Sequence, residues 1–245
     1  MDLKRLLWGR LPPNTLFPPG TDFDPVFRPW GITIYRTAYG DTPDSSAESD
    51  GNWQALLDDI QTPLRDELLK RGDPSKGGQD DETVYAARKL LSLFRLDARS
   101  DPQVLSNADM DQLREIYNAG AAGGEPMNAH GELRQCRIFL VADEETLASI
   151  AQAQQGGQQP AEEEQCEKVF VKCVDADYRP EDHGPPPWRT RVRAPQTYFG
   201  WMKMATRSLL RLWACLGDGG HLVDVTPRAS DAMTAKEIWT GEDED

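Results

Sequence analysis

The residues best suited to chemistry lie in a basic segment, residues 188–216. This segment contains six arginine and lysine residues and no acidic residue; since the net charge is −14, the rest of the chain carries −20. The basic residues are Arg189, Arg191, Arg193, Lys203, Arg207 and Arg211, with Trp188, Tyr198 and Trp201 between them. Arginine forms forked hydrogen bonds with carboxylates and phosphates and stacks on aromatic rings. The segment is therefore a candidate site for an anionic ligand or an acidic partner.

A structural role for these basic residues is the interpretation that we favour. In it, they neutralise acids of the same chain, including those at 242–245. Arg36 lies in the middle of an expected strand, so it needs an acidic or carbonyl partner. If the segment instead binds an external anion, the expected ligand-binding residues are Tyr35, Arg36, Arg189, Arg191, Trp201, Lys203, Arg207 and Arg211.

An acidic loop at 175–183 is a second candidate site. It gathers Asp175, Asp177, Glu181, Asp182 and His183 just after an expected strand, and such oxygen ligands suit Mg²⁺ or Ca²⁺. The loop is not an EF-hand, because Pro180 stands where the loop glycine belongs. A solvated loop is the preferred interpretation, and a divalent-metal hydrolase using Asp175, Asp177 and Asp182 is the weaker alternative.

The four cysteines, Cys136, Cys166, Cys173 and Cys215, are expected to be reduced core residues. With His130 they give the spacings H-x5-C and C-x6-C, whereas structural zinc sites show C-x2–4-C, so we expect no metal. Reduced cysteines favour a cytoplasmic location.

Catalytic and cofactor motifs give no further lead. The sequence contains neither G-x-S-x-G nor H-E-x-x-H, and the glycines at 120–124 follow an expected helix rather than a strand. We therefore expect no cofactor, and the sequence leaves open whether the protein is an enzyme.

Composition limits the classes of protein that are possible. Of 245 residues, 38% are hydrophobic and the mean hydropathy is −0.63, which allows one core with much polar chain around it. No run of 18 apolar residues could span a membrane, and the first residues lack a signal-peptide pattern. The net charge of −14 argues against nucleic acid as a partner.

Hydrophobic periodicity predicts the elements that position these residues. In the first half it predicts a strand at 32–39, an acidic loop at 41–51, and helices at 52–71, 82–96 and 107–119, with Pro63 bending or splitting the first helix. In the second half it predicts strands at 137–142, 167–175, 198–204 and 222–225, and helices at 143–154 and 206–216.

These elements predict a single α+β domain at 30–228 with a mainly antiparallel sheet. The β-α-β-β-α-β order within 136–226 is the ferredoxin-like pattern, to which the first strand and three helices are added. Residues 1–29 are expected to form a proline-rich extended arm, and residues 229–245 an acidic tail.

Two motifs resemble those of an uncharacterised intracellular family of filamentous fungi. They are W-G-x-x-x-Y-R-T-x-Y-G, from Trp30 to Gly40, and G-W-M-K, from Gly200 to Lys203; an acidic run after Val174 accompanies them. The resemblance implies a fungal source and an intracellular protein with acidic loop insertions. It implies no activity, because that family has none assigned.

We therefore expect a non-enzymatic, cytoplasmic protein-interaction or regulatory domain. The alternative is an enzyme or binding protein for a small anionic ligand held in a pocket lined by arginine and tryptophan. A concave pocket lined by these arginines would favour the alternative.

Overall fold

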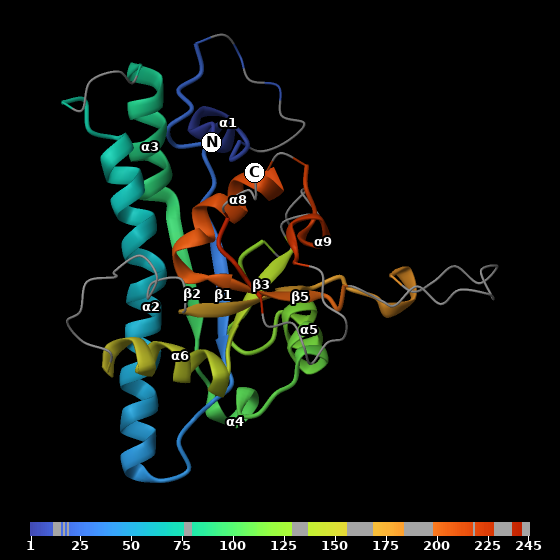
Figure 1. Ribbon diagram of the computed structural model, residues 1–245. Coiled ribbons are helices and arrows are strands. Elements are labelled where there is room, and N and C mark those ends of the chain that lie inside the picture. The colour runs from blue at the N-terminus through green and yellow to red at the C-terminus, as the bar shows by residue number, and fades with distance from the viewer. Residues whose placement is uncertain are drawn as a thin grey trace.

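The computed structural model of the protein describes residues 1–11, 16, 18, 20–75, 80–128, 137–155, 169–183, 198–217, 219–227 and 237–241. Within these ranges, six strands form one sheet in the order β2-β1-β3-β4-β5-β6 (Figure 1). The strands are β1 (Trp30–Arg36), β2 (Phe94–Arg99), β3 (Ile138–Ala142), β4 (Phe170–Asp175), β5 (Trp201–Ala205) and β6 (Ile238–Trp239).

The sheet is mixed, so the prediction of a mainly antiparallel sheet is wrong. The pairs β2–β1, β1–β3 and β5–β6 are parallel, whereas β3–β4 and β4–β5 are antiparallel. Helices connect β1 to β2 and β2 to β3, and such crossovers return the chain to the end of the sheet where it started. The broader expectation of one sheet combined with helices is confirmed.

The ferredoxin-like order predicted for 136–226 is not the order of this sheet. In that pattern the two strands of each β-α-β unit are parallel and another strand separates them. Here β3 and β4, which α6 (Glu144–Gln155) connects, are direct antiparallel neighbours. The predicted strand at 222–225 is instead a short helix, α9 (Leu222–Val225), and β6 lies in the segment predicted to be an acidic tail.

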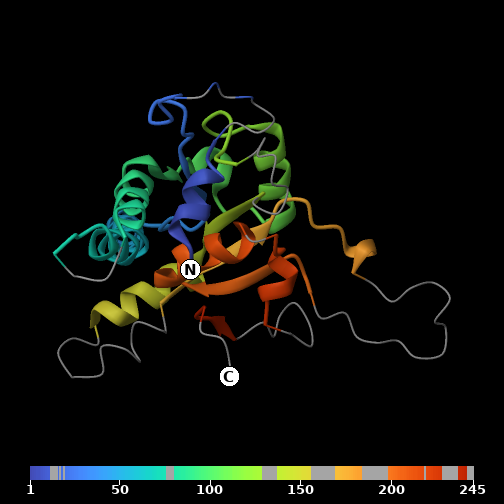
Figure 2. The ribbon, with the colours of Figure 1, turned by 90° about the horizontal axis from the view of Figure 1, so that it is seen from above.

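Helices cover both faces of the sheet. One face packs against α1 (Leu3–Trp8), α2 (Pro43–Arg71), α3 (Asp81–Leu93), α6, α8 (Leu209–Gly217) and α9, and the other against α4 (Pro102–Leu105) and α5 (Met110–Ala119). Alternate strand residues supply the two clusters: Ile34 and Leu140 face the larger one, and Tyr35 and Phe139 face the smaller. Figures 1 and 2 show α2 and α3 side by side, away from α5.

Helix α2 begins nine residues earlier than predicted, so the prediction of a loop at 41–51 is wrong for 43–51. Thr42 and Ser45 form a reciprocal capping box, and Pro43 occupies the first turn, where its missing N–H has no cost. These signals outweigh the weak helix propensity of the serines and aspartates that follow. Pro63 lies inside one continuous helix rather than splitting it.

Two further elements differ from the sequence-based expectation. Residues 3–8 form helix α1, because they precede the first proline and the Asp2 carboxylate accepts hydrogen bonds from the first-turn amides; the prediction of an extended arm is wrong there. Strand β2 was not predicted, because it follows α3 without a turn and extends that helix's apolar stripe into Phe94. The buried indole of Trp30 joins these elements by donating to the Leu90 carbonyl, 2.7 Å away.

Candidate functional site

Tyr35 and Arg36 are adjacent on β1 and therefore point to opposite faces of the sheet. Tyr35 is fully buried under α5, where its ring packs edge-on against Phe139, and burial raises the pKa of its hydroxyl to about 12. These two residues therefore do not converge on one anion site.

Arg36 is held by its own chain, as its position within a strand predicts. Its guanidinium is 3% exposed and donates to the Ala38 carbonyl (2.9 Å), the Asp50 carboxylate (2.6 Å) and the Ser49 hydroxyl (2.8 Å). It also stacks on the Tyr39 ring, 4.6 Å from the centroid. These contacts tie the chain after β1 to the first turns of α2.

Lys203 is paired with Glu145 of α6. It lies directly opposite Lys172 on the neighbouring antiparallel strand, and Glu145 bridges the two ammonium groups, 2.5 Å from Lys203 and 2.9 Å from Lys172. Lys172 also contacts Asp143, at 2.5 Å. Partial burial acts to raise the pKa of Glu145, but its hydrogen bonds to Lys203 and Lys172 outweigh that effect and lower it.

The remaining described candidates of the basic segment lie on three different elements. Trp201 is half-buried at the start of β5, and the Lys172 ammonium lies 5.4 Å from its ring centroid. Arg207 lies in the turn η3 (Thr206–Ser208) and Arg211 in α8, where its side chain packs beside Gly241. Arg189 and Arg191 lie outside the described residues.

In the acidic loop, the carboxylates of Asp175 and Asp177 accept hydrogen bonds from other groups of the protein. The Asp175 carboxylate accepts from the Asp177 amide (2.9 Å) and the Tyr198 hydroxyl (3.1 Å), and the Asp177 carboxylate accepts from Arg137 (2.7 Å). In the part of the chain that the structure describes, no group of three or more His, Cys, Asp or Glu residues could hold a metal ion. His130, Cys136 and Cys166 lie outside that part.

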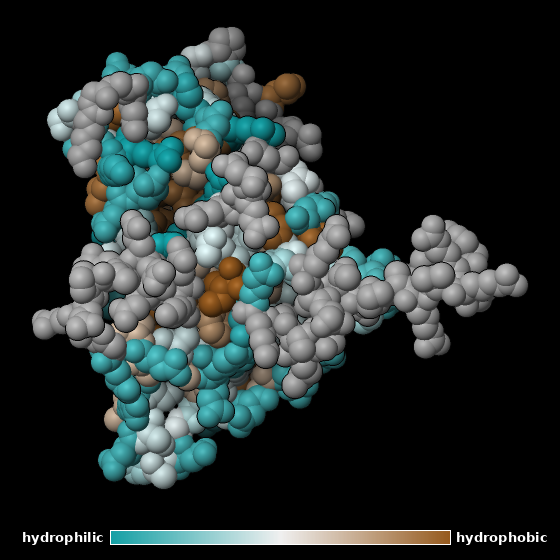
Figure 3. All heavy atoms as spheres, viewed as in Figure 1, coloured by the Kyte–Doolittle hydropathy of each residue, from teal (hydrophilic) through white to brown (hydrophobic). Residues whose placement is uncertain are grey.

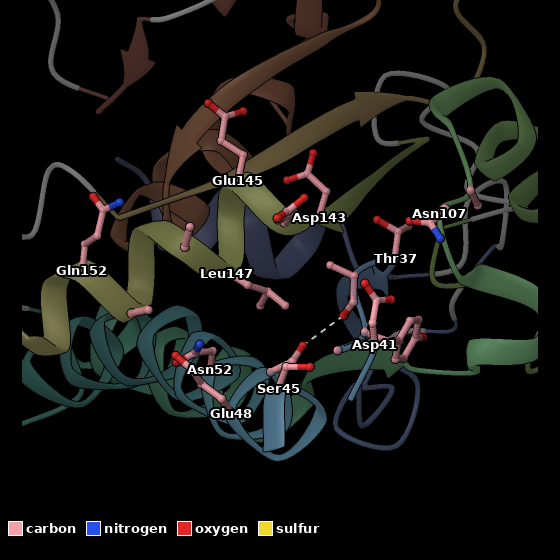
Figure 4. Close-up of a pocket in the computed structure, with 18 residues that line it drawn as sticks. Thr37, Asp41, Ser45, Glu48, Asn52, Asn107, Asp143, Glu145, Leu147 and Gln152 are labelled. Carbon is pink, nitrogen blue, oxygen red and sulfur yellow. Dashed lines mark hydrogen bonds between the residues drawn. The ribbon is translucent and has the colours of Figure 1, made fainter. Parts of the chain in front are cut away.

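A groove of about 840 Å³ lies at the carboxyl ends of β1 and β3 (Figure 4). From β1 the chain passes through α2 and α3 to β2, on one side of β1, whereas from β3 it passes through α6 to β4, on the other side of β3. The connections thus leave β1 and β3 in opposite directions. In open α/β sheets this switch point is where ligands bind.

Four segments line this switch-point groove. Its floor is formed by 37–41, its walls by α2 and α6, and one end by 107–108. The lining residues are Thr37, Ala38, Tyr39, Gly40, Asp41, Ser45, Glu48, Ser49, Asn52, Asn107, Ala108, Asp143, Glu144, Glu145, Leu147, Ala148, Ala151 and Gln152. None of the six described members of the predicted anion site is among them.

Local backbone geometry holds the floor against both walls. A Cβ on Gly40 would lie 2.1 Å from the carbonyl carbon of Ser45, so only glycine allows the chain to pass so close to the start of α2. Asn107 adopts φ 56°, and its backbone N–H donates to the Thr37 carbonyl. The backbone N–H of Thr37 in turn donates to the Ala142 carbonyl. The loop before α5, the end of β1 and the end of β3 are thereby joined.

The groove acids divide into two groups. Asp143 and Glu145 are paired with Lys172 and Lys203, and Figure 4 shows both carboxylates directed away from α2. Asp41, Glu48 and Glu144 form no ion pair with any of the residues that the structure describes. Hydrophilic and neutral residues predominate over α6 and the lower part of α2 in Figure 3. Among the residues that the structure describes, the groove thus has three carboxylates without an ion-pair partner.

The comparisons with known proteins add no relative: no family model, curated protein or solved structure matches this chain. The resemblance to fungal proteins therefore stays a prediction. None of the helices in the described ranges is both long and apolar enough to span a membrane.

Sequence reasoning did not identify the groove. One wall comes from a segment predicted to be a loop, and the acids at the start of α6 lie outside both predicted candidate sites. A usable signal was present, since two apolar strands are each followed by polar and acidic residues, at 37–41 and 143–145.

Proposed function

We propose that this protein is a non-enzymatic interaction module that binds a positively charged ligand in the switch-point groove. The observation that carries the proposal is that Asp41, Glu48 and Glu144 line a groove at the carboxyl ends of parallel strands without a described cationic partner. The net charge of −14 would also attract cations at long range. Cysteine usage favours the reducing cytoplasm as its location.

The side-chain chemistry of the groove supports binding rather than catalysis. Its described lining offers carboxylates, carboxamides and hydroxyls, without histidine, cysteine or lysine. Histidine is the side chain that most often acts as a general acid or base near neutral pH. We prefer this proposal to a small anionic ligand because Arg36 and Lys203 are paired with acids of the chain.

Putrescine, a simple dication, is a suitable probe for this proposal. We expect saturable binding by titration calorimetry that weakens as salt rises, because exposed charges are screened over about 10 Å at 0.1 M. Glu48→Gln should weaken binding about twofold to fivefold, the range expected for one exposed ion pair.

The matched control is Glu115→Gln, which makes the same charge change at an exposed position of α5, outside the groove. Its affinity should equal that of the wild type. If putrescine does not bind, or if the two variants weaken binding equally, the groove is not a cation site.

A further inference from the structure

The shape of the switch-point groove indicates what kind of cation it takes. Sites for small molecules enclose most of the ligand surface. Here the walls are shallow: Glu48 on α2 and Glu144, Ala148 and Gln152 on α6 are all exposed although they line the groove. A small amine would therefore remain largely hydrated, whereas a chain lying along the groove would contact both walls.

The length of the groove fits a short extended peptide. Its α2 wall runs from Ser45 to Asn52, which is about 10 Å at a rise of about 1.5 Å per residue. An extended chain covers that length with about three residues, at roughly 3.3 Å each.

The lining offers separate groups for a peptide backbone and for basic side chains. Asn52 on α2, Gln152 on α6 and Asn107 at one end each carry a carboxamide, which can both donate to a peptide carbonyl and accept from a peptide N–H. Ala148 and Ala151 add apolar surface on α6, whereas Leu147, which Figure 4 places between the walls, is buried.

Such a lining suits lysine and arginine. Their methylene stems pack on apolar surface while the charged end reaches an acid. The carboxylates of Asp41, Glu48 and Glu144, which have no ion pair within the described ranges, line the same groove.

We infer that the occupant of the switch-point groove is an extended segment of a partner protein, about three residues long in the groove and carrying lysine or arginine. This inference rests on the proposed function, because it assigns a partner to the same cation site. It adds that the groove recognises the peptide backbone as well as the charge.

The test compares putrescine with a blocked Ala-Lys-Ala-Lys-Ala peptide, which carries the same charge and adds peptide groups. We expect the peptide to bind about tenfold more tightly, since each backbone hydrogen bond adds a modest gain in affinity. Asn52→Ala should remove most of that difference. Alanine favours a helix, so α2 should tolerate this change.

The matched control is Gln54→Ala, which removes a carboxamide from an exposed position of α2 outside the groove and should leave both affinities unchanged. Equal affinity for peptide and putrescine, or a peptide affinity that Asn52→Ala does not lower, would overturn the peptide inference while the cation site stands. Failure of both ligands to bind would overturn the proposed function itself.

Discussion

Lys172 and Lys203 lie directly opposite each other on adjacent antiparallel strands, and a single carboxylate, that of Glu145, bridges them. Like charges in such a cross-strand pair repel each other. Both lysines are nearly buried, at 9% and 8% exposure, so the repulsion is only partly screened. The bridge therefore fixes the first turn of α6, one wall of the switch-point groove, to the sheet.

Glu145→Gln should lower the free energy of unfolding by about 1–2 kcal/mol. Among the described residues, the substitution leaves Lys172 paired with Asp143 and Lys203 without an ion pair. The expected loss is below that of a fully buried pair because the Glu145 side chain is half exposed. Urea unfolding of the wild type and the variant measures it.

Glu144→Gln is the matched control, since it makes the same change one residue earlier, where no described ion pair exists. It should cost at most about 0.5 kcal/mol, the size of a helix-dipole effect. Equal losses for the two variants would contradict a bridging role for Glu145.

The same bridge predicts an acid-sensitive contribution to stability. The pKa of Glu145 is lowered in the folded state, so its contribution is fully present above the ordinary glutamate value of 4.5. It is lost as the pH falls from that value through the folded pKa. Unfolding free energies measured from pH 7 to pH 3 should therefore fall more steeply for the wild type than for Glu145→Gln, and parallel curves would contradict the prediction.

The sequence predicts those structural features whose interacting residues are close together in the chain. The apolar run at 137–142 predicted β3, and the helix predicted at 143–154 is α6, whose first turn is capped by Asp143 as it accepts from the Thr146 amide at 3.0 Å. Arg36 likewise has the acidic and carbonyl partners that its place in a strand predicts. Each of these follows from periodicity or from the cost of burying a charge.

The groove was not predictable in the same way. It depends on the parallel pairing of β1 with β3, whose paired residues are more than 100 positions apart, and periodicity does not specify which strands become neighbours. Glu145 and Lys203 are 58 positions apart in the sequence. The sequence shows the charge imbalance of the basic segment. It does not show which acid forms an ion pair with Lys203, because that depends on the order of the strands in the sheet.

Arg36→Lys should destabilise the protein by about 1–3 kcal/mol despite conserving the charge. The guanidinium makes three directed hydrogen bonds and stacks on Tyr39, and a lysine ammonium cannot reproduce that planar fork. Arg65→Lys, at an exposed position of α2, is the control and should change stability by no more than about 0.5 kcal/mol. The midpoints of urea unfolding of the wild type and the two variants provide the comparison. Equal midpoints would contradict a stabilising role for the Arg36 hydrogen bonds.

Combined replacement of Arg207 and Arg211 by glutamine tests whether the basic segment serves the protein itself or an external anion. The two side chains lie one helical turn apart and are half-buried. If their charges compensate acids of the same chain, the double variant should lose stability, by about 0–1 kcal/mol for each exposed pair, and the loss should shrink in high salt. Thermal unfolding at low and high ionic strength measures this loss.

Inorganic phosphate separates the two interpretations of that segment. If the segment binds an external anion, its arginines repel one another in the free protein. The substitution removes that repulsion, so the variant would be more stable than the wild type in dilute buffer. Phosphate would then raise the melting temperature of the wild type and not that of the variant, because a ligand stabilises only the form that binds it. We expect the opposite: a slightly less stable variant and equal, small responses to phosphate in both proteins. A saturable shift that depends on Arg207 and Arg211 would instead support the anionic-ligand alternative.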